Sequence, residues 1–261
     1  MIKVGVFGAG GRMGLTVCQT VVDAPDMDLV AAVDPHHSGI EIRQLGIQGP
    51  NIQVGGRSDA MEAAEVAVDF TQIEAARENL RWCAEHGVHA VVGTTGFGPD
   101  DFLEFERLFS RSDANAVIAP NFAIGAVLMM RFAEMAAPYF PTAEIVELHH
   151  DAKTDAPSGT AMLTAERMAA ASDDWADDPT TYEVAEGARG GAGPGGIHIH
   201  SLRIRGMVAH QEVVLGTTGQ SLTIRHDSYD RSSFMPGVLL AVRAVAERPG
   251  LTVGLDTLLG I

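Results

Sequence analysis

Short apolar runs and amphipathic helical patterns alternate through the first 120 residues of the chain. Runs rich in Val, Ile and Ala predict strands, and apolar residues spaced three and four apart predict helices. The predicted strands are Lys3–Phe7, Leu29–Val33, Val66–Asp69, Ala90–Val92 and Ala116–Ile118, and the predicted helices are Gly11–Val22, Ile73–Glu85 and Pro99–Phe109. Such alternation is typical of a parallel sheet covered by helices. It predicts a Rossmann-like, doubly wound α/β domain.

The pattern changes after a helical run at Ile124–Met135, because strands now follow one another more directly. Strands are expected at Glu144–His149, His198–Ala209, Glu212–Gly216 and Ser221–His226, with one helix at Thr160–Ala171. This order predicts a second α+β domain with an open mixed sheet. The last helical pattern, Phe234–Glu247, is expected to return to the first domain. The predicted domains are therefore residues 1–122 completed by 232–261, and residues 123–231.

Between the helix and the later strands lies an irregular acidic stretch, Ser172–Pro179, followed by the glycine-rich segment Gly187–Gly196. So many glycines disfavour a single backbone conformation. We expect this segment to be a mobile loop or lid.

The 261-residue chain has a formal net charge of −16 and only 18 lysines and arginines. A nucleic acid or an anionic membrane surface would need a basic face, so the charge argues against both partners. Cys18 and Cys83 fall within helical patterns, which argues against a disulfide framework and fits a reducing cytoplasm. The apolar run at Ile2–Phe7 is expected to be a strand rather than a signal peptide, and no stretch approaches the ~20 apolar residues of a membrane span.

A glycine-rich turn follows the first predicted strand and opens the first predicted helix. It consists of Gly8, Ala9, Gly10, Gly11, Arg12, Met13 and Gly14. The spacing is a variant of G-x-G-x-x-G, because Met13 stands where the strict motif has glycine. A turn at this place holds a dinucleotide pyrophosphate against the N–H groups of a helix start, although glycine-rich turns also occur for steric reasons alone.

Asp34 ends the second predicted strand, twenty positions after Gly14. An acidic residue there accepts hydrogen bonds from the adenosine ribose hydroxyls and favours NADH, whereas a site for NADPH alone more often has an arginine. Arg12 is a candidate cation for the 2′-phosphate of NADPH. His36 and His37 fit an exposed polar turn as well as a phosphate contact. The predicted cofactor is NADH, NADPH or both.

Two further turns follow predicted strands. The first is Gly93, Thr94, Thr95 and Gly96, and the second is Ala119, Pro120, Asn121 and Phe122. Ligands of open α/β sheets bind at the carboxyl ends of the strands, so we expect both turns to line the cofactor site with Gly8–Gly14.

The densest group of chemically active residues is His149–Thr160. It contains His149, His150, Lys153 and Asp155, and then Ser158, Gly159 and Thr160 at the start of a helical pattern. Ser158 is the expected N-cap, and Gly159 and Thr160 leave helix N–H groups open to an anion. Strict strand alternation would send the two histidines to opposite faces, so one of them is expected to act as the acid. The spacing suggests no third ligand for a metal, and we predict none.

These motifs resemble those of the 4-hydroxy-tetrahydrodipicolinate reductase family, also called dihydrodipicolinate reductases. The resemblance rests mainly on Glu147–Ala161, with support from Gly8–Gly14, Asp69–Thr71, Gly93–Thr95, Ala119–Phe122 and Ile224–Gly237. It implies that a cyclic dicarboxylate is reduced by NAD(P)H on the diaminopimelate route to lysine.

The resemblance also implies roles for individual residues. His149 would donate or accept the proton, Lys153 would be a second donor, and His150, Ser158, Gly159 and Thr160 would bind substrate. Cofactor contacts would come from residues 8–13, Asp34, Gly93–Thr95 and Ala119–Phe122. The family further implies hinge motion and a homotetramer joined through sheets of the second domain, with His198–Arg205 in an interface strand. Pro35 replaces the family's arginine after the acidic residue, which favours NADH.

Two other functions remain open from the residues alone. One is another two-domain NAD(P) oxidoreductase, such as an aspartate or homoserine dehydrogenase, which would share the glycine turn but not the segment His149–Thr160. The other is a non-catalytic NAD(H) sensor, which would have no need of clustered proton donors beside an anion site.

Overall fold

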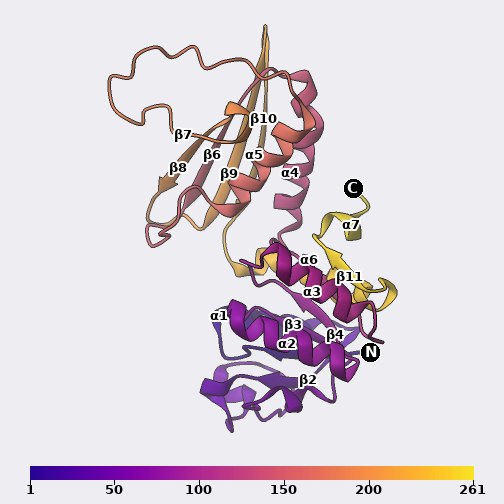
Figure 1. Cartoon of the computed structure of the whole chain (residues 1–261). Helices are drawn as coiled ribbons and strands as arrows, with labels where there is room; N and C mark the ends of the chain where they lie inside the picture. Colours follow the sequence, from indigo (N-terminus) through magenta and orange to yellow (C-terminus); the bar gives the residue numbers. More distant parts are fainter. The chain divides into compact units, whose positions relative to one another are not determined.

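A computed structural model describes all 261 residues of the chain (Figure 1). Its backbone contacts divide it into two compact units: unit 1 comprises residues 1–124 and 234–261, and unit 2 comprises residues 125–233. None of the helices combines the length and apolar character that crossing a bilayer requires.

Six strands form the sheet of unit 1. In spatial order they are β11 (Leu251–Val253), β5 (Ala116–Ile118), β4 (His89–Val92), β3 (Val66–Asp69), β1 (Ile2–Phe7) and β2 (Met27–Val33). Every neighbouring pair is parallel. The strands are added outward from β1 in both directions, so the strand order reverses there. In open α/β sheets such a reversal marks the place where ligands bind.

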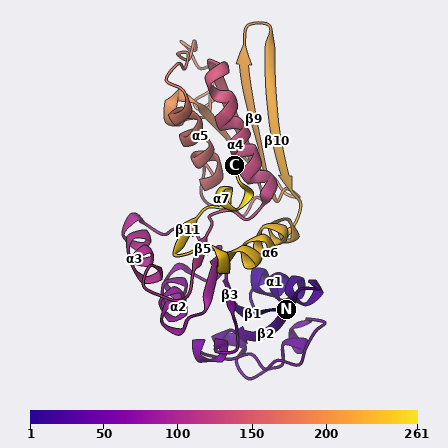
Figure 2. The ribbon, with the colours of Figure 1, turned by 90° about the vertical axis from the view of Figure 1, so that its right-hand side faces the viewer.

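Helices cover both faces of this sheet (Figure 2). α2 (Ile73–His86) packs beside α3 (Pro99–Phe109) on one face, and α1 (Arg12–Asp23) packs beside α6 (Met235–Ala244) on the other. Cys18 in α1 and Cys83 in α2 are free thiols whose pKa is raised by burial, to about 12 for Cys18. The short helices of unit 1 are η1 (Pro35–His37), η2 (Ile42–Leu45), η3 (Ser58–Met61), η7 (Val245–Glu247) and α7 (Asp256–Leu259).

The sheet of unit 2 is mixed. Its spatial order is β10 (Gln220–Ser228), β9 (Ala209–Thr217), β6 (Thr142–His149), β8 (His198–Arg203) and β7 (Gly191–Ala192). Only β6 and β8 run parallel to each other. α4 (Ile124–Ala136) and α5 (Gly159–Ala171) pack on one face, which buries Ile145, Val213 and Leu215. Three 3₁₀ turns, η4 (Ala137–Tyr139), η5 (Pro194–Gly196) and η6 (Arg231–Phe234), complete the connections. The predicted fold class is confirmed.

One strand prediction in unit 2 is wrong. The single strand expected over His198–Ala209 is two strands, because β8 ends at Arg203 and Gly206 turns the chain with a φ of +86° before β9 begins. The segment Gly187–Gly196 is anchored in part by backbone pairing: β7 pairs with β8, and the N–H of Gly193 donates to the carbonyl of Ile197 at 2.9 Å. Its mobility stays a prediction. The sequence analysis also missed β11, which has only three residues.

Asn115, directly before β5, fixes the C-terminal segment to the sheet of unit 1. Its Nδ2 donates to the carbonyls of Val245 and Ala246 at 3.0 and 3.1 Å, and its Oδ1 accepts from the N–H of Gly250 at 3.0 Å. The side chain is buried, so water cannot replace these partners easily.

Replacing Asn115 with alanine should lower the free energy of unfolding by about 1–3 kcal/mol, because three backbone groups lose their partner. Urea titration followed by circular dichroism measures this change. Asn51→Ala is the matched control, because Asn51 is exposed and its Nδ2 makes one hydrogen bond, to Glu41 at 3.2 Å. Equal effects of the two substitutions would contradict the role given to Asn115.

Candidate active site

The turn after β1 can be built only with glycine at two of its positions. Gly8 has a φ of +68°, which side chains rarely tolerate, and a Cβ added there would lie 2.9 Å from Cγ2 of Thr71. A Cβ on Gly14 would lie 2.0 Å from the carbonyl oxygen of Gly8. Gly11 is the N-cap of α1 and donates its N–H to the Gly8 carbonyl at 2.9 Å. The turn and the first turn of α1 are thus held against each other.

Asp34 lies directly after β2 and holds this turn in place. Its Oδ2 accepts from the N–H of Gly10 at 3.0 Å, and its Oδ1 accepts from the N–H of His36 at 2.9 Å. The ring of His37 lies 3.1 Å from the same Oδ1. Burial alone would raise the pKa of Asp34, but the contacts with His37, His36 and Gly10 outweigh it and lower that pKa. Asp34 is therefore a carboxylate at neutral pH.

A cavity of about 630 Å³ opens beside Asp34. Three predicted cofactor residues line it, namely Gly8, Gly11 and Asp34, together with Arg57 and Trp82, which the sequence analysis missed. The side chain of Arg57 is 86% exposed. Its loop lies beside the cavity because the N–H of Gly55 donates to the carbonyl of Ala32 in β2. The pair Gly55–Gly56 before an arginine was the available sequence signal.

The remaining predicted cofactor residues lie around the same strand ends but outside this cavity. Ala9, Gly10, Arg12 and Met13 belong to the turn and the start of α1. The turns Gly93–Thr95 and Ala119–Phe122 follow β4 and β5.

Phe70 connects those two turns with the loop after β3. A Cβ on Gly93 would lie 2.0 Å from the Phe70 ring, and the rings of Phe70 and Phe122 are 5.7 Å apart. Thr94 donates its hydroxyl to the carbonyl of Thr71 at 2.9 Å. The three predicted turns lie at the carboxyl ends of β1, β4 and β5, and the loop after β3 lies beside them.

The second group of predicted site residues lies in unit 2, where β6 ends. Alternation along β6 places Ile145, Glu147 and His149 on its helix-covered face. Nδ1 of His149 lies 2.5 Å from Oε2 of Glu147. Burial lowers the pKa of His149, and the neighbouring Glu147 carboxylate only partly offsets that effect.

Glu147 is completely buried and is paired with Arg203 through two hydrogen bonds of 2.9 Å each. Burial alone would raise the pKa of Glu147, but Arg203, Ser201 and His149 together lower it. The resemblance implies an interface strand for His198–Arg205, and that stays a prediction. The guanidinium of Arg203, the last residue of β8, reaches the carboxylate beside His149.

The loop after β6 carries the other predicted residues. Nζ of Lys153 lies 2.8 and 2.7 Å from the two carboxylate oxygens of Asp155, and this contact is the main cause of a lowered pKa of Asp155. Ser158 caps α5 as expected, accepting from the N–H of Ala161 at 3.2 Å. Gly159 and Thr160 form the first turn of α5.

His149 and His150 are not equivalent. His149 is the last residue of β6 and 17% of its side chain is exposed, whereas His150 lies outside the strand and is exposed. The strand therefore ends between them, and His149 alone contacts a buried carboxylate.

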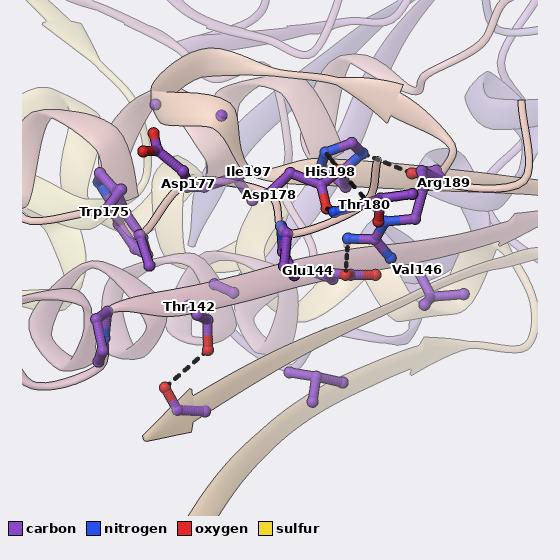
Figure 3. Close-up of a pocket in the computed structure, with 18 residues that line it drawn as sticks. Thr142, Glu144, Val146, Trp175, Asp177, Asp178, Thr180, Arg189, Ile197 and His198 are labelled. Atoms are coloured by element: carbon purple, nitrogen blue, oxygen red, sulfur yellow. Dashed lines mark hydrogen bonds and ion pairs between the residues drawn. The ribbon is translucent and has the colours of Figure 1, made fainter. Parts of the chain in front are cut away.

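Unit 2 has a cavity of its own, of about 610 Å³, which lies against the face of β6 opposite to Glu147 and His149 (Figure 3). Glu144, on that face, pairs with Arg189 at 2.6 Å and with Nε2 of His200 at 2.7 Å. His198 contacts Asp178 and the carbonyl of Arg189. His198 and His200 thus have carboxylate partners of their own, and no group of three or more His, Cys, Asp or Glu residues is arranged to hold a metal ion.

A glycine turn and an acidic residue at the reversal of a parallel sheet, with an imidazole and an ammonium group on a second unit, define the class of two-domain, nicotinamide-dependent oxidoreductases.

Comparison with known proteins narrows this class to one family. The N-terminal and C-terminal domain models of dihydrodipicolinate reductase match residues 2–122 and 125–259. The chain is 52% identical to 4-hydroxy-tetrahydrodipicolinate reductase of Cutibacterium acnes and 53% identical to that of Thermobifida fusca, in each case over the full length of both chains. The chain belongs to the dihydrodipicolinate reductase family.

Solved structures support the same family assignment. The dipicolinate-bound dihydrodipicolinate reductase from Paenisporosarcina sp. TG-14 is 39% identical, with a TM-score of 0.86 over 98% of this chain and 99% of that one. An amine dehydrogenase from Mycobacterium smegmatis, at 15% identity and a TM-score of 0.67, shares the fold alone.

Proposed function

We propose that this chain catalyses the NADH- or NADPH-dependent reduction of 4-hydroxy-tetrahydrodipicolinate, by way of dihydrodipicolinate, to tetrahydrodipicolinate in lysine and diaminopimelate biosynthesis. The observation that carries the proposal is the arrangement of His149, Lys153 and the capped start of α5 around one loop, in a chain whose two halves both match this family. We assign cofactor binding to residues 1–122 with 232–261, and substrate binding to residues 123–231.

The cofactor site fits a dinucleotide. Gly8 and Gly11 leave the turn without side chains where a pyrophosphate would approach, and the adjoining cavity ends at the ionised Asp34. Residues Gly8–Met13 would hold the pyrophosphate, and Asp34 the adenosine ribose. Gly93–Thr95 and Ala119–Phe122 would flank the remainder of the cofactor. When bound, the reduced nicotinamide supplies the hydride.

The substrate is a dicarboxylate, so its site needs positive charge and N–H donors in a strongly acidic chain. Lys153 and the N–H groups of Gly159 and Thr160 supply them, with His150 beside the loop. Hydride addition to the conjugated C=C–C=N system leaves an enamine, and protonation of its carbon completes the reduction. We assign this proton transfer to His149, with Lys153 as the second donor.

Lysine is rare in this chain, so the choice of lysine at position 153 is evidence about the role of that residue. There are sixteen arginines but only two lysines, Lys3 and Lys153. The ammonium group of a lysine carries protons that can be transferred, whereas a guanidinium is effectively never deprotonated. A lysine at position 153 therefore agrees with a role in proton transfer as well as in carboxylate binding.

Lys153→Ala should lower kcat by about 10²–10⁴-fold and raise KM for the substrate, while the Kd of NADH stays unchanged. Lys153→Arg keeps the charge but not the transferable proton, so it should recover much of KM and little of kcat. Steady-state kinetics and NADH fluorescence titration measure these constants, with the exposed Lys3→Ala as control. Near-normal turnover of Lys153→Ala would disprove its role.

The choice between NADH and NADPH depends, we propose, on Arg57. The carboxylate of Asp34 favours the ribose hydroxyls of NADH and repels a 2′-phosphate. Arg57 lines the cavity next to Asp34, and its Nε lies 3.7 Å from Oδ2 of Asp59. Both side chains of this pair are exposed, and such a pair contributes little free energy, so the guanidinium can turn toward the phosphate. Arg12, the cation favoured by the sequence, does not line this cavity. We therefore expect both cofactors to bind, NADPH with the help of Arg57.

Arg57→Ala should raise the Kd of NADPH roughly tenfold and leave that of NADH nearly unchanged, because one charge-assisted hydrogen bond to the phosphate is lost. Fluorescence titration without substrate gives both constants, and Trp82 in the cavity wall provides an intrinsic signal. Arg12→Ala is the comparison variant. If it selectively weakens NADPH and Arg57→Ala does not, the assignment belongs to Arg12.

We also propose that the chain forms a homotetramer through the sheets of unit 2. Family membership supports this, and so does the face of β6 and β9 that α4 and α5 leave uncovered, which carries Glu144, Val146 and Val214.

The proposed function is tested by following NADH and NADPH oxidation at 340 nm with freshly prepared product of the preceding synthase reaction. We expect rapid absorbance loss with this substrate and none with aspartate semialdehyde or an amino acid. The reverse result would indicate an aspartate or homoserine dehydrogenase, and nucleotide binding without turnover of any substrate would indicate a sensor.

A further inference from the structure

Glu147 stands beside the assigned acid and has no role so far. We propose that Glu147, held by Arg203, is a positioning residue that fixes the ring orientation and the tautomer of His149, with the proton on Nδ1 and with Nε2 left for the reaction. This inference rests on the proposed function only in taking His149 as the group that transfers the proton.

The hydrogen bonds of Glu147 determine where the proton of His149 lies. Oε1 accepts from Nη2 of Arg203 at 2.9 Å and from the N–H of Ser158 at 3.2 Å. Oε2 accepts from Nη1 of Arg203 at 2.9 Å and faces Nδ1 of His149 at 2.5 Å. An ionised carboxylate can only accept. Nδ1 of His149 must therefore carry the hydrogen, and in the neutral ring Nε2 is then the free acceptor.

Arg203 is what keeps this carboxylate ionised. A completely buried carboxyl group without a partner would hold its proton, and a protonated Glu147 could donate to His149 and impose the other tautomer. The two parallel hydrogen bonds from the planar guanidinium prevent this. Arg203 also donates to the carbonyl of Asp155 at 2.7 Å, so the same side chain holds the loop that carries Lys153.

A purely structural role is the competing explanation, because the Glu147–Arg203 pair also connects β6, β8 and the start of α5. Such a role would affect stability, and it would leave both the tautomer and the pKa of His149 unchanged. The test must therefore measure the imidazole itself.

Charges around His149 give a second readout. Glu147 on β6 favours the imidazolium, while Lys153 on the loop and Arg203 on β8 disfavour it. Removing the charge of Glu147 should therefore lower the pKa of His149 further. Because the acid form is required, activity falls as pH rises through that pKa, and the fall in the variant should begin at a lower pH.

Glu147→Gln separates the two roles, because the side chain keeps its shape. Arg203 donates to both oxygens of Glu147 and so does not decide how the amide turns. The Ser158 N–H lies on the Oε1 side only and can only donate, so it takes the single amide oxygen, and the NH₂ should face Nδ1 of His149. An NH₂ group there demands an acceptor, and the ring should move its proton to Nε2.

The experiment is ¹⁵N NMR of histidine-labelled protein without substrate, with His149→Asn used to assign the signals. In the wild type we expect a protonated Nδ1 and an unprotonated Nε2 for His149, and in Glu147→Gln the reverse. The variant should also lose activity, by at least about tenfold and up to the ~10⁴-fold loss known when a catalytic histidine is held in the wrong tautomer. The Kd of NADH should not change.

Glu144→Gln is the matched control. Glu144 lies on the same strand and likewise pairs with an arginine and a histidine, Arg189 and His200, but on the opposite face. It should alter the spectrum of His200 and leave His149 unchanged.

A neutral His149 with its proton on Nε2 in the wild type would exclude the role of Glu147. The wild-type spectrum therefore tests the inference even if the variant does not fold. Unchanged tautomer, pKa and pH profile in Glu147→Gln would also exclude it and leave a structural role. The proposed function itself is tested separately. If it is wrong, the wild-type protein will not turn over the substrate, whichever tautomer His149 has.

Discussion

The buried ion pair between Glu147 and Arg203 is the interaction that holds the candidate site of unit 2 together. It connects neighbouring parallel strands, bonds to the N–H that precedes α5, and holds the loop between them through a backbone carbonyl. A charge in this environment is tolerated only when it is paired and fully hydrogen-bonded. Since the pair meets both conditions, the loop between β6 and α5 has a rigid base although much of its own surface is exposed.

Unit 1 uses a carboxylate at a strand end in a similar way. Asp34 accepts from two backbone N–H groups and thereby fixes the glycine turn. Asp69, at the end of β3, makes the contrast clear. It accepts from the N–H of Thr71 at 2.7 Å and from Asn79 at 2.7 Å, but no cation contacts it, and burial raises its pKa. At Asp69, hydrogen bonds from neutral groups organise the turn without lowering the pKa of the carboxyl group. At Asp34 and Glu147, a partner that carries or can carry positive charge also lowers that pKa.

The features that sequence predicted well depend on neighbours along the chain. The glycine turn, the Ser158 cap and most strands of unit 1 follow from local spacing, and the fold class follows from their order. Glu147 could have been found too, because strand alternation places it on the face of His149. Arg203 could not, since its partner is fifty-six residues away and nothing near it indicates burial. Arg57 had only a faint local signal, the pair Gly55–Gly56 before it, because the pairing of its loop with β2 is what brings it to Asp34.

The C-terminal return of the chain affects how the protein is made. β5 lies inside the finished sheet only because β11 pairs with it, and β11 is made after all of unit 2. Until then the nascent first unit has an open edge of unpaired backbone groups, and such an edge invites pairing with another chain. All of unit 2 is synthesised during that interval. If unit 2 folds rapidly, β11 comes within reach of β5 sooner. If unit 2 folds slowly, the edge of β5 stays exposed for longer.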